Sequence, residues 1–366
     1  MNDASLFSCD PSVFIVNGEY QICALVESEC TMWVEIAGRN FYDHSNGILR
    51  SGSFVHIAHV PQDLLDGTKS YTVHLRKLNE RKPYFTDYGD IESKSCEFHP
   101  IREKEEYHVI NLADAHSLVE EPIRSGSYFG DKLDLLVMNG DIPNHSDDVR
   151  YFKSIYLIAG AITHGQVPCV FSRGNHDMRG RSAECLADYT PTDNGKSYYT
   201  FRAGPIWGIV LDVGEDKPDS VSNYGWTICC EAFRQEEDDF IDEVIRRGDY
   251  RDASARLVIS HAPFSYKRYK GEHFDAKRLH EWREKINLIR PTLMLSGHLH
   301  FCYLDPPDGE QAPDGLDCPV VCSSRVQIEP PSSHTSGAIL LQRDKVTVRF
   351  VNDRSEIEDE VSCPLP

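Results

Sequence analysis

From residue 107 onward, short apolar runs alternate with longer segments whose apolar residues recur at helical spacing. Strands that alternate with helices predict an α/β domain built on a largely parallel sheet. In such sheets, ligands bind outside the carboxyl ends of the strands, so functional side chains should follow the strands directly. The predicted strands cover 107–112, 133–138, 167–171, 207–212, 257–260 and 292–295, and the predicted helices cover 147–164, 231–247 and 275–288.

Residues 1–105 have a different pattern, in which short alternating runs are separated by turn-forming stretches such as Asn17-Gly18 and Asp66-Gly67. Regular short strands with turns between them predict a β-sandwich. The charged stretch 101–107 has the composition of a linker. We therefore expect two domains, an all-β domain at 1–105 and an α/β domain at 106–366.

The overall charge of the chain is −20, which disfavours binding to long nucleic acids because that binding depends on neutralising backbone phosphates. A small phosphorylated molecule remains a suitable ligand, since bound metal cations reverse the local field. No apolar run is long enough to span a membrane, and the first residues lack the pattern of a signal peptide. We expect a cytoplasmic protein with no membrane partner, whose twelve scattered cysteines have structural roles, and Cys169 and Cys322 are expected to be buried, reduced thiols.

Nine residues that bind metals or move protons follow the predicted strands in five clusters. Taken singly, each cluster has an ordinary structural explanation, such as a turn or a surface histidine. Together they all lie at predicted strand ends, which favours one shared site over five coincidences. The clusters are Asp114 and His116; Asp141; Asn175, His176 and Asp177; His261; and His298 and His300.

Asp, His and Asn supply oxygen and nitrogen ligands, which suit Mn, Fe, Zn or Co better than a thiolate-binding metal. A shared carboxylate can bridge two such ions about 3.5–4 Å apart. A pair of this kind lowers the pKa of a shared water, and the resulting hydroxide can attack phosphorus in line. A neighbouring histidine can then protonate the leaving alkoxide. The sequence therefore predicts a two-metal site suited to cleaving phosphate esters, with the identity of the metals left open.

The ordered clusters resemble the metallophosphoesterase (calcineurin-like phosphoesterase) superfamily over roughly residues 107–352. The resemblance implies a four-layer αββα fold with a dinuclear site between loops. By the same resemblance, Asp114, His116 and His300 hold one metal ion, Asn175, His261 and His298 hold the other, and Asp141 bridges them.

The resemblance also assigns roles to the two residues after Asn175. His176 would be the catalytic histidine, which protonates the leaving group or grips the phosphate. Asp177 would orient His176 through a hydrogen bond, as carboxylates beside metal sites commonly do for histidine.

A fibronectin III/Ig-like sandwich ahead of such a domain also resembles purple acid phosphatases. Those enzymes have Asp-x-Gly in the first cluster and a tyrosine three positions after the second-cluster aspartate. This chain has His116 and Asn144 at those places. With no tyrosinate available there, we predict that the protein lacks the purple charge-transfer colour.

Three further residues are candidates for substrate contact, each with a structural alternative. Arg173 can bind a phosphate oxygen or point away from the metals, and an arginine fork suits phosphate. His145 can touch substrate or face solvent, and Tyr224 can pack on an organic leaving group or pack locally. The basic stretch 266–270 can screen an anionic substrate, although a solvated charge run is the usual case.

The leading hypothesis is a dinuclear metal-dependent hydrolase whose metal-bridging hydroxide attacks a small phosphomonoester or phosphodiester. Within the enzyme class, the alternative is a nucleotide or cyclic-nucleotide phosphodiesterase, or a nuclease. The alternative from another class is a binding or scaffold protein that kept the fold and lost catalysis, which would be expected to lack a ligand or His176. Neither is missing here. The sequence does not decide the natural substrate, the oligomeric state or the role of the N-terminal domain.

Overall fold

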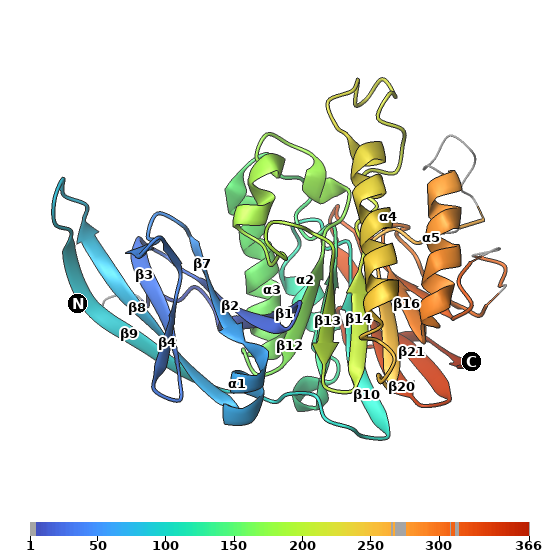
Figure 1. Cartoon of the computed structure of the whole chain (residues 1–366), viewed down its shortest axis with the longest axis horizontal. Helices are drawn as coiled ribbons and strands as arrows, with labels where there is room; N and C mark the ends of the chain where they lie inside the picture. The colour runs from blue at the N-terminus through green and yellow to red at the C-terminus, as the bar shows by residue number, and fades with distance from the viewer. Residues whose placement is uncertain (1–4, 265, 268–275, 308, 312–314, 366) are drawn as a thin grey trace.

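The computed structural model describes residues 5–264, 266–267, 276–307, 309–311 and 315–365, and two large β-sheets lie at its centre (Figure 1). The larger sheet has ten strands in the order β22 (Ile357–Pro364), β21 (Lys345–Asn352), β20 (Ser333–Gln342), β10 (Glu106–Leu112), β11 (Leu135–Asn139), β12 (Pro168–Ser172), β1 (Ser12–Val16), β2 (Glu19–Leu25) and β7 (Val55–Pro61), with β19 (Arg325–Gln327) paired to β20. The smaller has six, in the order β13 (Tyr199–Ala203), β14 (Ile206–Val210), β15 (Ala255–Ile259), β16 (Leu293–Ser296), β18 (Val320–Ser323) and β17 (Cys302–Asp305).

The two sheets face each other across an apolar core, and helices cover their outer faces. On β10, Val109 packs between the sheets whereas Ile110 packs under the helices, which explains why this strand is apolar throughout. The result is the expected four-layer αββα arrangement. The larger sheet is covered by α2 (Glu120–Gly126) and α3 (Lys153–Thr163), and the smaller by α4 (Cys230–Arg247) and α5 (Ala276–Ile289).

The N-terminal region is strand-rich, as predicted. Its projecting part is a sheet with the order β4-β3-β8-β9, which lies at one end of the molecule (Figure 1). Met32 and Val34 of this sheet join the same core that lies between the two large sheets. The elements of this region are β3 (Cys30–Ile36), β4 (Arg39–Tyr42), β5 (His44–Ser45), β6 (Ile48–Leu49), α1 (Gln62–Thr68), β8 (Ser70–Glu80) and β9 (Asp87–Glu97).

The strand pairing crosses residue 105, where the predicted boundary between the two domains lies. β1 pairs in parallel with β12, and β2 and β7 extend the larger sheet beyond it. The five residues of β1 are all buried, with Val13 and Ile15 between the sheets and Phe14 under α3. An apolar run of this length fits a sandwich core and a central parallel strand equally well, which is why the sequence pattern did not separate them.

Most helices lie close to their predicted positions. The segment 147–164 becomes a 3₁₀ turn, η2 (Val149–Phe152), followed by α3, and α4 and α5 match the other two predicted helices, except that Asp275 lies outside the described residues. Among the described helices, none is long and apolar enough to cross a bilayer. All twelve cysteines are free thiols. Three more 3₁₀ turns are η1 (Gly130–Lys132), η3 (His176–Met178) and η4 (Ala183–Asp188).

Candidate metal centre

The five clusters follow strands of both large sheets and meet at one edge of the molecule. Asp114 and Asp141 come two residues after β10 and β11, and Asn175 comes three after β12. His261 and His298 come two residues after β15 and β16 in the other sheet. Because these five strands run parallel within their sheets, their carboxyl ends bring the clusters together. The prediction that the functional residues lie at strand ends is therefore confirmed.

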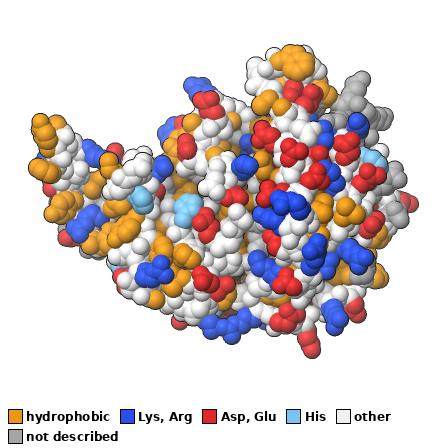
Figure 2. All heavy atoms as spheres, viewed as in Figure 1, with side chains coloured by type: hydrophobic (Ala, Val, Ile, Leu, Met, Phe, Trp, Pro, Cys, Tyr) orange, Lys and Arg blue, Asp and Glu red, His pale blue; other side chains and the backbone are white. Residues whose placement is uncertain are grey.

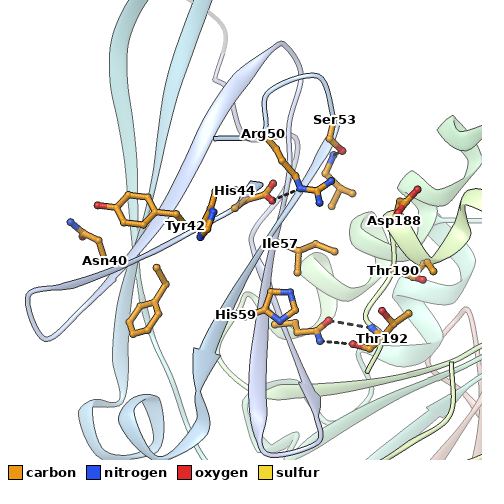
Figure 3. A pocket seen from close by; sticks show the side chains of 15 residues that line it. Asn40, Tyr42, His44, Arg50, Ser53, Ile57, His59, Asp188, Thr190 and Thr192 are labelled. Atoms are coloured by element: carbon orange, nitrogen blue, oxygen red, sulfur yellow. Dashed lines mark hydrogen bonds and ion pairs between the residues drawn. The ribbon is translucent and has the colours of Figure 1, made fainter. Parts of the chain in front are cut away.

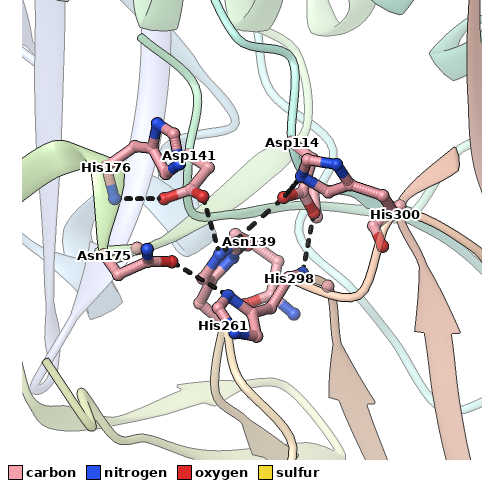
Figure 4. Close-up of polar contacts among 12 residues, drawn as sticks. Asp114, Asn139, Asp141, Asn175, His176, His261, His298 and His300 are labelled. Carbon is pink, nitrogen blue, oxygen red and sulfur yellow. Dashed lines mark hydrogen bonds and ion pairs between the residues drawn. The ribbon is translucent and has the colours of Figure 1, made fainter. Parts of the chain in front are cut away.

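One group of metal-type ligands consists of Asp114, His116 and His300 (Figure 4). The Nε2 atoms of His116 and His300 lie 3.0 Å apart, and Asp114 Oδ1 lies 3.2 Å from His300 Nε2 and 3.5 Å from His116 Nε2. Asp114 Oδ1 is buried and accepts no hydrogen bond from the described part of the chain. A buried carboxylate oxygen beside two imidazole nitrogens is an arrangement that a cation would satisfy.

A second group consists of Asp141, His261 and His298, with Asn175 beside it. His261 Nε2 lies 3.1 Å from Asp141 Oδ2, and the amide oxygen of Asn175 lies 2.9 Å from His298 Nδ1 (Figure 4). With the amide turned over, its nitrogen would instead donate to His298 Nδ1. As placed, the amide oxygen of Asn175 accepts a hydrogen bond when Nδ1 of His298 carries the hydrogen, and both atoms are of the kind that ligate a metal ion. Asp141 also forms a group with His116, so it stands between the two ligand sets.

The backbone at this centre is strained. Non-glycine residues with positive φ are uncommon, and they cluster at functional sites where the surrounding structure holds them. Five of the candidate ligands have this conformation, with φ between 45° and 69°. They are Asp114, His116, Asp141, His298 and His300.

Buried amides fix the orientation of His261 from behind. Its Nδ1 atom lies 2.6 Å from the carbonyl oxygen of Asn139, and because a carbonyl only accepts, Nδ1 carries the hydrogen. The Asn139 amide donates to Asn111, which in turn donates to the carbonyl of Ser296 on the other sheet. This chain of contacts leaves Nε2 of His261 facing the carboxylates and ties the two sheets together beneath the site.

Without a metal ion, the carboxylates of the centre hold a proton on one histidine. Burial alone would lower the pKa of His261, but the neighbouring Asp141 and Asp114 outweigh it and raise the pKa to about 10. Burial, aided by the charge on His261, lowers the pKa of His298 to about 4. A metal ligated by His261 must therefore displace a proton, so metal binding is coupled to proton release.

His176 and Asp177 lie at the centre, but Asp177 does not orient His176 as predicted. Asp177 Oδ2 accepts backbone hydrogen bonds from Gly174 and Asp141, at 2.7 and 3.1 Å. The ring of His176 is oriented by the carbonyl oxygen of Asn144, 2.7 Å from Nδ1. The buried Asp177 carboxylate therefore fastens two ligand-bearing loops to each other, because backbone N–H groups point at it from both loops.

Arg179 also belongs to the centre, although the sequence pattern did not predict it. Its Nη1 atom lies 2.8 Å from His176 Nε2. The 3₁₀ turn η3 explains the contact, because residues three apart in such a turn lie on the same side. The spacing His176-x-x-Arg179 after a strand was the one signal that could have revealed it. Since an arginine only donates, Nε2 accepts and the hydrogen of His176 is on Nδ1.

The contacts of Arg173 and His145, two of the three candidate substrate residues, are with side chains other than the candidate metal ligands. Arg173 donates from Nε to Asp212 Oδ2 at 2.5 Å and lies over the ring of Phe233, so it points away from the ligands. The ring of His145 packs edge-on against Tyr151.

Tyr224 is connected to the centre only indirectly. Its hydroxyl donates to Glu215 at 2.6 Å, and Glu215 binds Arg179. Of the basic stretch 266–270, residues 268–270 lie outside the described residues.

A separate polar cavity of about 480 Å³ lies between the N-terminal strands and the segment 187–192 (Figure 3). His44, Arg50 and His59 line one side, and Asp188 and Thr192 line the other. None of the candidate metal ligands lines it.

Comparison with known proteins agrees with the geometry of the centre. The larger part of the chain, residues 98–302, matches the model of the calcineurin-like phosphoesterase family. Among solved structures, the chain is similar to purple acid phosphatase PPD1 from yellow lupin (Lupinus luteus) seeds, with 11% identity over 98% of this chain and 75% of that one and a TM-score of 0.62.

It is also similar to the structure of PhoD, with 11% identity over 100% of this chain and 90% of that one and a TM-score of 0.56. At this identity the two structures show a shared fold. A search of curated protein sequences finds no match. The family match covers more than half of the chain and includes the candidate ligands of both groups, so the chain belongs to the calcineurin-like phosphoesterase family and is a phosphoric ester hydrolase.

Proposed function

We propose that this enzyme hydrolyses small phosphoesters with two metal ions held on either side of Asp141. The observation that carries the proposal is the convergence of two ligand groups on this one carboxylate. Asp114, His116 and His300 would hold one ion, and Asn175, His261 and His298 the other. When bound, the ions supply activation of the attacking water and Lewis-acid polarisation of the phosphoryl oxygens.

The protein side chains around the metals position the substrate and manage the proton. His176 is oriented by the Asn144 carbonyl, so its Nε2 atom faces Arg179. To protonate a leaving alkoxide, His176 must carry a proton on Nε2, so the N–H of Arg179 that now meets Nε2 needs another acceptor. We expect the phosphoryl group of the substrate to accept that N–H.

The charge of the enzyme favours small substrates over nucleic acid. Acidic side chains gather on the face that α4 forms (Figure 2), and Glu236, Asp239 and Asp242 of this helix are exposed. A polyanion approaching this face would be repelled, whereas a small phosphoester meets only the local field of the metal centre.

The test is a metal reconstitution paired with two substrates. Protein stripped of metal would be loaded with Mn, Fe, Zn or Co, its metal content measured by elemental analysis, and its turnover measured with 4-nitrophenyl phosphate and bis(4-nitrophenyl) phosphate. We expect two ions per chain and metal-dependent release of nitrophenol. Two bound ions without turnover of either substrate would instead favour a scaffold protein.

A further inference from the structure

The guanidinium of Arg179 is held in place at the centre by a buried carboxylate. Arg179 Nε donates to Glu215 Oε1 at 2.6 Å, and Nη2 donates to Oε2 at 2.9 Å, which is a two-pronged arginine–carboxylate pair. The Glu215 side chain is 1% exposed, whereas that of Arg179 is 37% exposed. The carboxylate is thus the fixed partner, and the guanidinium is the part that faces outward.

The loop that carries Glu215 is itself tied down. The hydroxyl of Tyr224 donates to the same Oε2 atom at 2.6 Å, and Arg234, which is fully buried, donates to the carbonyl of Val213 at 2.8 Å. These contacts place Glu215 before any substrate arrives. A charge that is already oriented needs no reorganisation on binding, and this makes it effective.

Arg179 is oriented so that the edge of its guanidinium formed by Nη1 and Nη2 faces His176 and Asn175. Nη1 lies 2.8 Å from His176 Nε2, and Nη2 lies 2.8 Å from the terminal amide atom of Asn175 that faces it. A cation is therefore fixed on the side of the centre formed by these two residues. Charged nitrogen donors in this position suit an oxyanion of the substrate.

We propose that Arg179 forms a subsite for the third terminal oxygen of a phosphomonoester dianion, so that the enzyme prefers monoesters to diesters. The inference rests on the proposed function, in which the bound metals would polarise phosphoryl oxygens of the substrate. A monoester has a third charged oxygen for Arg179, and near neutral pH it is largely a dianion. A diester has an uncharged ester oxygen at that place, which accepts a weaker hydrogen bond.

The alternative is that Arg179 only fastens the loop of Glu215 to the site. A loop fastener would affect monoesters and diesters alike, because neither would touch it. Arg181 provides a matched control. It lies two residues further along, its side chain is 81% exposed, and it pairs with Asp147 away from the metal ligands. Replacing either arginine with alanine removes the same charge from the chain.

The experiment measures binding of methyl phosphate and dimethyl phosphate to metal-loaded protein by calorimetry. Arg179→Ala should weaken methyl phosphate binding by roughly 10- to 100-fold, the range for losing a charged hydrogen bond, and dimethyl phosphate binding by less than about threefold. Arg179→Lys should recover part of the affinity for methyl phosphate. Arg181→Ala should change neither, and thermal unfolding should show that all variants are folded.

Equal weakening of both ligands by Arg179→Ala would overturn the proposal, as would unchanged binding of methyl phosphate or no binding of it to the wild type. Turnover of 4-nitrophenyl phosphate by the wild type tests the hydrolase function separately. If binding changes as expected but the wild type has no turnover, the subsite stands and the hydrolase function fails. If the wild type turns over 4-nitrophenyl phosphate but Arg179→Ala does not lose methyl phosphate binding selectively, the hydrolase function stands and the subsite fails.

Discussion

Replacing Gly174 with alanine should disable the centre through a single methyl group. An alanine Cβ at this position would lie 2.2 Å from Asp141 Oδ1 and 2.4 Å from the Asp141 backbone nitrogen, well inside the 3.0 Å limit of real contacts. Asp141 would have to retreat by about 1 Å, and a displacement of that size near reacting groups lowers turnover about 100-fold. Overpacking of this kind also lowers the free energy of unfolding by about 1–3 kcal/mol.

The prediction is checked by measuring metal content and turnover of 4-nitrophenyl phosphate on Gly174→Ala. Because Gly174 does not have a positive φ, alanine is acceptable to its backbone, and the steric clash alone is tested. Gly52→Ala is the matched control, since a Cβ there meets nothing within 4 Å. If Gly174→Ala keeps two ions and wild-type turnover, the close approach of Gly174 to Asp141 does not matter to the centre.

Five further outcomes are expected. His176→Ala should lower turnover by roughly 10²- to 10⁴-fold with both ions retained, whereas Asp141→Asn should reduce the content of both ions in elemental analysis. Arg173→Ala should lower the free energy of unfolding in urea by about 3–5 kcal/mol, because it leaves buried Asp212 without its cation, and a value near zero would contradict this. Burial and Asp141 raise the pKa of Asp177 from 3.8 to about 8. Protonated Asp177 therefore stabilises the folded state below pH 4, and this stability is lost as the pH rises to 8. In urea unfolding, the metal-free wild type should lose stability over this interval relative to Asp177→Asn. The metal-loaded protein should show no visible charge-transfer band that depends on a tyrosine.

The ligand clusters could be predicted from sequence because each depends on one local rule. Asp114 and Asp141 follow apolar strands directly, and parallel strands of one sheet end at one edge. The prediction that Asp114 and Asp141 lie close together does not depend on how the two sheets face each other. The contact between Asp114 and His300 does depend on how the two sheets face each other. The local sequence pattern does not predict this contact, and the family resemblance did.

Apart from the local contact between His176 and Arg179, the contacts around His176 could not be predicted, because they join segments that only the folded loops bring together. Glu215 reaches Arg179 across 36 positions of the chain. Arg173 directly precedes Gly174 and has the chemistry of a phosphate ligand. Its guanidinium instead donates to Asp212 and lies over the ring of Phe233. Buried Asp212 and Glu215 on the neighbouring loop thus fix where Arg173 and Arg179 point, and the sequence around the two arginines does not show which carboxylate each one meets.

The N-terminal strands bear on the centre through β1. β1 pairs with β12 through Val13 and Phe14, and β12 ends three residues before Asn175. A chain that began at residue 106 would leave one edge of β12 unpaired and would remove Phe14 from the core beneath α3. β12 would then be an edge strand held by β11 alone, and the loop from Arg173 to Asp177 would lose the support that β1 gives to β12. The strand-rich region is therefore part of what positions Asn175 and His176, and a division of the chain at residue 105 would separate the metal centre from one of its supports.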